Sequence, residues 1–244
     1  MRLRVFVKIT ARMTINFQEF GKGRQKIIFL HGWQQNSKSF LSLVPFLYRQ
    51  FKLYFLDLPG FGKTPLSTNL SSSTDYARLI SRWLQKKQIN KPVVVGHSFG
   101  GKVAALLASQ CPQELEKLIL IAPAGIPHPR WWYPLSAKIP PKIKQKLEPI
   151  TKIVFTSRDF KEAGPLQPIL ANIVKEDLRS VFANIHAPTL IIWGKTDQEL
   201  PLTDGQEINR LIPNSQLKII PAGHFPFWDQ PKKAAQIISR FIAR

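Results

Sequence analysis

The stretch KPVVVGHSFGGKVAALLA, residues 91–108, decides the fold of this chain. Its first half is a β-branched apolar run typical of a buried strand, and its second half has the apolar pattern of a buried helix. One serine, Ser98, lies between the two halves, flanked by Gly96, Gly100 and Gly101. Because a tight turn needs small residues, the glycines alone indicate only that the chain turns sharply there. Strand, turn and helix in succession predict an α/β protein in which Ser98 follows the carboxyl end of a strand.

The same alternation of strands and helices continues along the chain. Strands are predicted for residues 3–9, 13–20, 25–32, 52–60, 92–98, 117–125, 188–197 and 217–224, and helices for residues 37–48, 72–88, 99–109, 203–211 and 231–243. Continuous apolar strands separated by helices indicate a mostly parallel sheet with helices on both faces. The predicted fold class is therefore α/β, with an eight-stranded sheet whose functional residues follow the carboxyl ends of the strands.

One segment, residues 126–178, interrupts this alternation. It is rich in proline, lacks a clear buried strand and follows the predicted strand at residues 117–125. We expect it to form an inserted cap or lid of short helices and loops, so that residues 1–125 and 179–244 form the core. Its first part, residues 126–146, carries five lysines and arginines and no acid beside the cluster Trp131, Trp132 and Tyr133.

The chain is strongly basic. Its 244 residues contain 35 Lys and Arg against 15 Asp and Glu, which gives a net charge of +20. A positive field of this size favours anionic partners, and it leaves non-specific attachment to nucleic acid or to an anionic membrane as an alternative. No nucleic-acid-binding motif, signal peptide or membrane-spanning run is recognised. We expect a cytoplasmic protein, and its one cysteine, Cys111, agrees with a reducing compartment.

Three residues that follow predicted strands form a candidate catalytic set. The sequence GHSFG, residues 96–100, matches the G-x-S-x-G nucleophile elbow, in which a serine is exposed on a strand-to-helix turn. A serine is a weak nucleophile at its ordinary pKa, so it needs a general base and a carboxylate that orients the base. Asp197 or His224 alone could be a turn or packed loop residue. The order Ser98, Asp197, His224 at three strand ends favours catalysis instead.

Acyl transfer also needs donors for the oxyanion of a tetrahedral intermediate. The backbone N–H of Phe99, directly after the serine, is the first candidate. The loop FLHGWQQNS, residues 29–37, supplies the second, because His31 and Gly32 let the chain turn tightly and leave the amide of Trp33 facing the site. A purely structural turn is the alternative interpretation of this loop.

Two other possible sites, a phosphate-binding loop and a metal site, are not supported by the sequence. GFGKT, residues 60–64, is similar to the end of a phosphate-binding loop, but the spacing of that loop requires glycine at position 57, where Asp57 lies. We expect Asp57 to cap or brace the turn at its strand end. The five histidines show no ligand-like pairing with one another or with cysteine, so no metal and no cofactor are predicted.

Five motifs together resemble those of α/β-hydrolase fold serine hydrolases: HGW at 31–33, DLPGFG at 57–62, GHSFGG at 96–101, WGKTD at 193–197 and AGHFPFWDQP at 222–231. The resemblance spans essentially the whole chain outside the insertion. It implies a triad of Ser98, Asp197 and His224, an oxyanion hole from Trp33 and Phe99, and an eight-stranded sheet under a cap. Many members of this family carry another glycine shortly after the His-Gly pair, whereas this chain has Gln34 and Gln35.

These features predict an enzyme, a carboxylesterase that cleaves an ester or related acyl bond of a small molecule through an acyl-serine intermediate. Trp131, Trp132 and Phe225 are the candidate substrate-binding residues. The basic stretch 126–146 is either a solvated basic face, which the excess of Lys and Arg along the whole chain favours, or a surface that receives an anionic substrate or an acidic carrier protein. The carrier is suggested by analogy with family members that demethylate pimeloyl-carrier-protein esters. A carbon–carbon bond hydrolase and a non-catalytic ligand-binding or scaffold protein of this fold are the alternatives.

Overall fold

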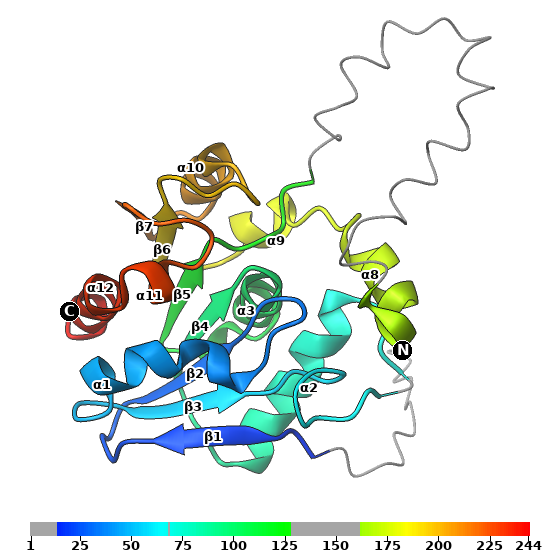
Figure 1. Ribbon diagram of the computed structural model, residues 1–244, viewed down its shortest axis with the longest axis horizontal. Helices are drawn as coiled ribbons and strands as arrows, with labels where there is room; N and C mark the ends of the chain where they lie inside the picture. The colour runs from blue at the N-terminus through cyan, green and yellow to red at the C-terminus, as the bar shows by residue number, and fades with distance from the viewer. Residues whose placement is uncertain (1–13, 68, 128–161) are drawn as a thin grey trace, which may run out of the picture.

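The computed structural model describes residues 14–67, 69–127 and 162–244. Within them, one sheet has the strand order β1-β3-β2-β4-β5-β6-β7 (Figure 1). The strands are β1 (Phe17–Phe20), β2 (Lys26–Leu30), β3 (Lys52–Leu56), β4 (Val93–His97), β5 (Lys117–Ile121), β6 (Thr189–Gly194) and β7 (Ser215–Ile220). Strand β1 pairs antiparallel with β3, and the other pairs are parallel. The mostly parallel sheet is confirmed with seven strands, and the eighth, expected at residues 3–9, lies outside the described residues.

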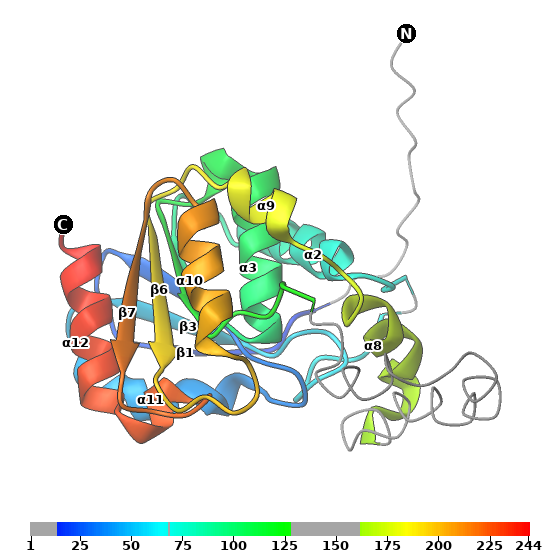
Figure 2. The ribbon, with the colours of Figure 1, turned by 90° about the horizontal axis from the view of Figure 1, so that it is seen from above.

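Helices cover both faces of the sheet, as Figure 2 shows in a view along its edge. One face is covered by α2 (Ser73–Lys86), α3 (Phe99–Gln110), α9 (Arg179–Ala183) and α10 (Leu202–Leu211), and α8 (Gln167–Ile173) lies beyond the sheet on the same side. The other face is covered by the 3₁₀ helix η1 (Ser37–Leu43), α1 (Val44–Leu47), α11 (Pro226–Asp229) and α12 (Pro231–Ile242). Two further 3₁₀ turns are η2 (Pro112–Glu114) and η4 (Gly164–Leu166).

The five inner strands, β2 to β6, are mostly apolar because each faces two cores, whereas the edge strands β1 and β7 carry exposed polar residues such as Glu19 and Lys218. In β2, Ile28 and Leu30 pack into the core on the α3 side, whereas Ile27 and Phe29 pack into the core on the α12 side. Successive side chains of a strand point to opposite faces, so a strand covered by helices on both faces has no solvent-facing position for polar residues. All four of these side chains are fully buried. This double burial is why the strands appear in the sequence as continuous apolar runs.

The predicted helix at residues 37–48 begins as the 3₁₀ helix η1 and continues as the short helix α1. Pro45 lies in the first turn of α1, where its missing N–H breaks no helical hydrogen bond. Helices α9 and α11 were not predicted, because elements of five and four residues are too short to show a helical period. None of the helices in the described part of the chain has the length and apolar character needed to cross a membrane.

The described end of the insertion, residues 162–178, is anchored to the core. Ile169, Leu170 and Ile173 of α8 are buried against the α3 side. The Lys102 Nζ of α3 donates to the carbonyl oxygen of Ile173 and lies 3.4 Å from Glu176 Oε2. The cap itself stays a prediction, because most of the insertion, including Trp131, Trp132 and most of the basic stretch 126–146, lies outside the described residues.

Candidate active site

Ser98 lies on the sharp turn between β4 and α3. Its backbone angles are φ 49° and ψ −113°, and a positive φ of this kind costs a non-glycine residue on the order of 1–3 kcal/mol. Backbone hydrogen bonds hold the turn: Ser98 N–H donates to the carbonyl of Ile121 at 3.1 Å, and the Ser98 carbonyl accepts from Gly101 at 3.0 Å and Ala124 at 3.1 Å. A strained serine at the carboxyl end of a strand is the geometry that GHSFG predicts.

Gly96 and Gly100 let this turn pack closely against the sheet. A Cβ atom on Gly96 would lie 2.3 Å from the carbonyl oxygen of Gly100, and a Cβ on Gly100 would lie 2.1 Å from the carbonyl oxygen of Leu30. Neither distance is compatible with a side chain, so any larger residue would push α3 away from β4 and β2. The two glycines are therefore required by the close approach of the backbone on both sides of Ser98.

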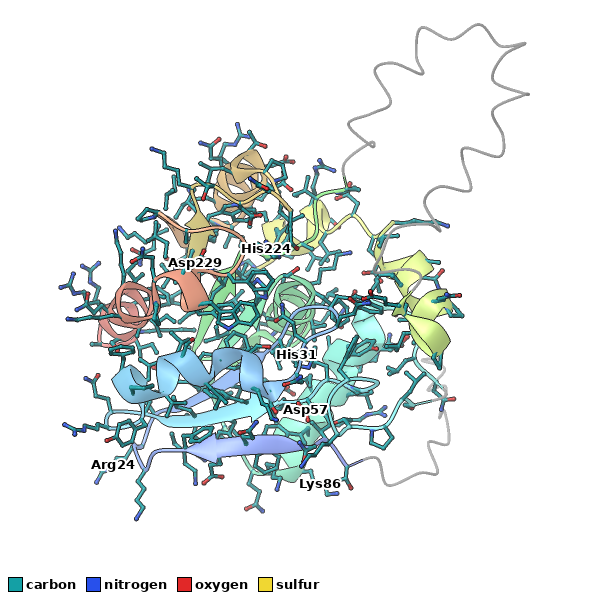
Figure 3. All side chains as sticks on the ribbon, viewed as in Figure 1. Arg24, His31, Asp57, Lys86, His224 and Asp229 are labelled. Atoms are coloured by element: carbon teal, nitrogen blue, oxygen red, sulfur yellow. The ribbon has the colours of Figure 1, made fainter. Side chains whose placement is uncertain are left out.

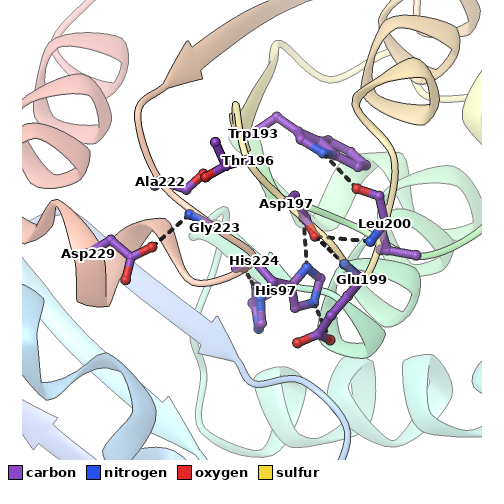
Figure 4. A network of polar contacts seen from close by, with 10 residues as sticks. All are labelled: His97, Trp193, Thr196, Asp197, Glu199, Leu200, Ala222, Gly223, His224 and Asp229. Atoms are coloured by element: carbon purple, nitrogen blue, oxygen red, sulfur yellow. Dashed lines mark hydrogen bonds and ion pairs between the residues drawn. The ribbon is translucent and has the colours of Figure 1, made fainter.

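Asp197 and His224 are brought into direct contact by the ends of β6 and β7. His224 Nδ1 donates to Asp197 Oδ2 at 2.8 Å, and the two side chains are 4% and 0% exposed (Figure 4). Asp197 Oδ1 accepts from the backbone N–H of Glu199 at 2.9 Å and of Leu200 at 3.0 Å. Burial acts to raise the pKa of Asp197, but these hydrogen bonds hold it below its ordinary value. An ionised Asp197 keeps the imidazole proton on Nδ1 and leaves Nε2 as the basic nitrogen.

Ser98 lies at the same edge of the sheet as this pair, because β4, β6 and β7 run parallel. The neighbouring His97 links the two loops: its Nε2–H donates to the carbonyl oxygen of His224 at 2.9 Å, and the two rings are 4.7 Å apart. Ser98 Oγ and His224 share no hydrogen bond within the described part of the chain. Catalytic hydrogen bonds are often long without substrate and tighten in the substrate complex.

Two residues of this site have no role that is predicted from the sequence. Burial lowers the pKa of His97 to about 3, so this ring is neutral and holds the His224 loop through Nε2–H. The second residue is Glu199, whose Oε2 lies 3.4 Å from His224 Nε2 (Figure 4). His97 is the second residue of GHSFG, directly before Ser98, and this position could have drawn attention to it. No sequence signal identifies Glu199, which lies two residues after Asp197.

The two residues that carry the candidate oxyanion donors contact each other through their rings. The rings of Trp33 and Phe99 are in edge contact at 5.4 Å, and the backbone N–H groups of both residues have no acceptor among the described residues. The loop before Trp33 is held by His31, whose Nδ1–H donates to the Gly32 carbonyl at 2.8 Å and whose Nε2 accepts from Leu58 N–H at 2.9 Å. Burial lowers the pKa of His31 to about 4, which keeps this bridge neutral.

A sequence model described as the alpha/beta hydrolase family matches residues 27–237. The chain belongs to this family. It is 27% identical to the monoacylglycerol lipase ABHD6 of Bos taurus, covering 90% of this chain and 76% of the relative. It is 25% identical to a pimeloyl-[acyl-carrier protein] methyl ester esterase of Aeromonas hydrophila, covering 94% and 100% of the two chains. A crystal structure of a membrane phospholipase A has the same fold, with a TM-score of 0.77 at 22% identity over 94% of this chain and 82% of that one. The family and the two sequence relatives support hydrolase activity.

This chain keeps the tight turn of the candidate oxyanion loop without the extra glycine. Gln34 adopts φ 55°, a left-handed conformation that glycine reaches more easily. The Gln35 side chain accepts from Gly32 N–H at 3.3 Å, and Gln35 N–H donates to the Gly32 carbonyl at 3.3 Å. The side-chain amide of Gln35 thus helps to close the turn that begins at His31.

Asp57 braces the loop after β3, as expected. Its buried carboxylate accepts from Ser37 N–H at 2.6 Å, Lys63 N–H at 2.8 Å and Asn16 Nδ2 at 2.7 Å. Burial acts to raise the pKa of Asp57, and these hydrogen bonds lower it below its ordinary value. Asp57 and His31, labelled in Figure 3, directly follow β3 and β2, so this bracing supports the same edge of the sheet as the site.

Of the predicted substrate-binding residues, Phe225 lies beside the candidate triad. Its ring is 5.2 Å from the His224 ring and stacks on Trp228 at 4.4 Å. Trp131 and Trp132 lie outside the described residues. In the part of the chain that the structure describes, no three His, Cys, Asp or Glu side chains gather as metal ligands would.

Proposed function

We propose that this protein is a serine hydrolase that cleaves a carboxylic ester through a covalent acyl-serine intermediate. The observation that carries the proposal is the buried Asp197–His224 hydrogen bond beside the strained Ser98 turn. The names of two relatives, a monoacylglycerol lipase and a methyl ester esterase, both describe ester cleavage and support an ester as the bond broken. Ser98 is the nucleophile, His224 the general base and Asp197 the carboxylate that orients the base.

In the acylation step, Ser98 Oγ attacks the ester carbonyl and its proton moves to His224 Nε2. Asp197 stabilises the resulting imidazolium through its hydrogen bond to Nδ1–H. The backbone N–H groups of Trp33 and Phe99 hold the oxyanion, and each such donor contributes about 10²- to 10³-fold in rate. The tetrahedral intermediate collapses, the carbon–oxygen bond to the alcohol breaks, and His224 gives its proton to the leaving oxygen.

In the deacylation step, His224 takes a proton from water, and the hydroxide attacks the acyl-serine carbonyl. Collapse of this second intermediate releases the carboxylic acid, and Ser98 Oγ regains its proton from His224. Phe225 lies beside His224, and we infer that its ring contacts the substrate next to the base. A neutral His97 holds the His224 loop during both steps, since it stays uncharged at any pH at which the base works.

The test is the Ser98→Ala variant with a short p-nitrophenyl ester, together with labelling by a fluorophosphonate probe. We expect the variant to lose hydrolysis by several orders of magnitude and to lose the label, while Ser180→Ala, an exposed serine on α9, keeps both. Hydrolysis by Ser98→Ala at the wild-type rate would refute the assignment. A wild-type protein that takes no label would favour the non-catalytic binding protein.

An acidic carrier protein is the second partner that we propose for the acyl substrate. The net charge of +20 supports it, as does a relative whose name includes an acyl-carrier-protein ester and whose whole length the match covers. Hydrolysis of the same acyl group should then be faster on the carrier than on a free methyl ester, and the advantage should decrease as salt is added. Equal rates on both substrates would exclude the carrier as a specific partner.

A further inference from the structure

Glu199 places a second carboxylate against the candidate catalytic imidazole. Asp197 Oδ2 lies 2.8 Å from Nδ1 of His224, and Glu199 Oε2 lies 3.4 Å from Nε2, so the ring lies between two acids (Figure 4). The backbone N–H of Glu199 donates to Asp197 Oδ1 at 2.9 Å. This hydrogen bond ties the position of Glu199 to the same carboxylate that orients the imidazole.

No lysine or arginine neutralises this carboxylate in the described part of the chain, although the protein has 35 basic residues and 15 acidic ones. Five other acids do lie within 4.0 Å of a lysine or arginine: Glu19, Asp75, Glu176, Asp177 and Glu207. The ionisable side chain next to Glu199 is that of His224. The Glu199 side chain is 61% exposed, against 4% for that of His224, so its charge lies on the solvent side of the buried ring.

Because the Glu199 carboxylate lies next to Nε2 of His224, its charge faces one particular part of a bound substrate. In the proposed mechanism, Nε2 gives its proton to the oxygen of the leaving alcohol, so the alcohol passes directly in front of this nitrogen. The acyl chain is attached to the other side of the carbonyl carbon. Glu199 therefore acts more strongly on the leaving alcohol than on the acyl group.

We propose that Glu199 selects substrates by the charge of the leaving alcohol, favouring cationic and neutral alcohols over anionic ones. This inference rests on the proposed serine hydrolase function and specifies its substrate class. Two unit charges about 5–6 Å apart in a partly exposed site change a rate by about fivefold. The positive field of the whole chain attracts anions over longer distances, but within the last few ångströms the nearest charge dominates, and that charge is Glu199.

Three butyrate esters test the proposal: the choline ester, its uncharged isostere the 3,3-dimethylbutyl ester, and the anionic ester of 3-hydroxypropanoate. We would measure kcat/KM of each with the wild type, Glu199→Gln and Glu199→Lys. The matched control is Glu116→Gln, which removes the same charge from an exposed residue before β5, at the opposite edge of the sheet. Comparing ratios between enzymes cancels the intrinsic reactivity of each ester.

We expect the cationic-to-neutral ratio to fall about fivefold in Glu199→Gln and the anionic-to-neutral ratio to rise about fivefold, with larger changes in Glu199→Lys. The difference between wild type and variant should shrink at about 0.5 M salt, and Glu116→Gln should keep the wild-type ratios. Equal ratios in wild type and Glu199→Gln would overturn the inference and leave ester hydrolysis intact. An equal loss on all three esters would also overturn it, because it would make Glu199 a positioning residue. Failure of the proposed function itself is recognised separately, by hydrolysis that persists in Ser98→Ala.

Discussion

His31 and His97 should make this protein lose stability between pH 6.5 and pH 5. Burial lowers their pKa values to about 4 and about 3, from an ordinary value of 6.5 in the unfolded chain. Below pH 6.5 the unfolded chain therefore binds protons that the folded chain does not, and such linkage reduces the free energy of unfolding as the pH falls. The stabilisation is fully present above pH 6.5 and decreases as the pH falls toward 4 and 3.

The size of the effect follows from the two pKa values. Well below pH 6.5 each histidine changes the free energy of unfolding by about 1.4 kcal/mol per pH unit, so the loss between pH 6.5 and pH 5 is about 1.6 kcal/mol for each and about 3 kcal/mol for both. Urea unfolding curves recorded at half-unit steps of pH would measure it. The His97→Gln variant removes one of the two groups.

We expect His97→Gln to be less stable than the wild type at pH 7, because the hydrogen bond to the His224 carbonyl is altered, and to lose about half as much further stability on going to pH 5. Carboxylates such as Asp57 and Asp197 titrate lower and contribute equally to both proteins. A variant whose unfolding free energy changes with pH in parallel with that of the wild type would show that His97 is not held neutral by burial.

Two further predictions concern the elbow and the base. Gly100→Ala should destabilise the protein by several kcal/mol in thermal unfolding and abolish hydrolysis, because its Cβ would lie 2.1 Å from the Leu30 carbonyl. Gly223→Ala, whose nearest contact would be an ordinary 3.5 Å, should unfold close to the wild type, and equal behaviour of the two variants would contradict the packing argument. Asp197→Asn should lower kcat by about 10³- to 10⁴-fold in steady-state assays, because an amide no longer holds the His224 proton on Nδ1. A rate within tenfold of the wild type would remove Asp197 from the triad.

Much of the fold was predictable because residues that are neighbours in the chain specify its strands and the turn at Ser98. Strands buried on both faces appear as continuous apolar runs, and the strands that the structure describes lie where those runs are. The elbow is visible because its small residues lie within five positions of the chain. Helix α9 and the break between η1 and α1 were missed because short elements depend on packing and on single residues such as Pro45 rather than on a period.

The sequence by itself determined the strand-helix order, the turn at Ser98 and the candidates Asp197 and His224, because each follows from residues near it in the chain. Only the tertiary structure decided which groups surround the imidazole. His97 contacts the His224 carbonyl across 127 positions of the chain, and Asp197 contacts the His224 ring across 27. Glu199 Oε2 lies next to Nε2 of His224 because the parallel strands β6 and β7 bring the loops that follow them to one edge of the sheet. Distances between such residues depend on strand register and loop closure, which no local pattern specifies.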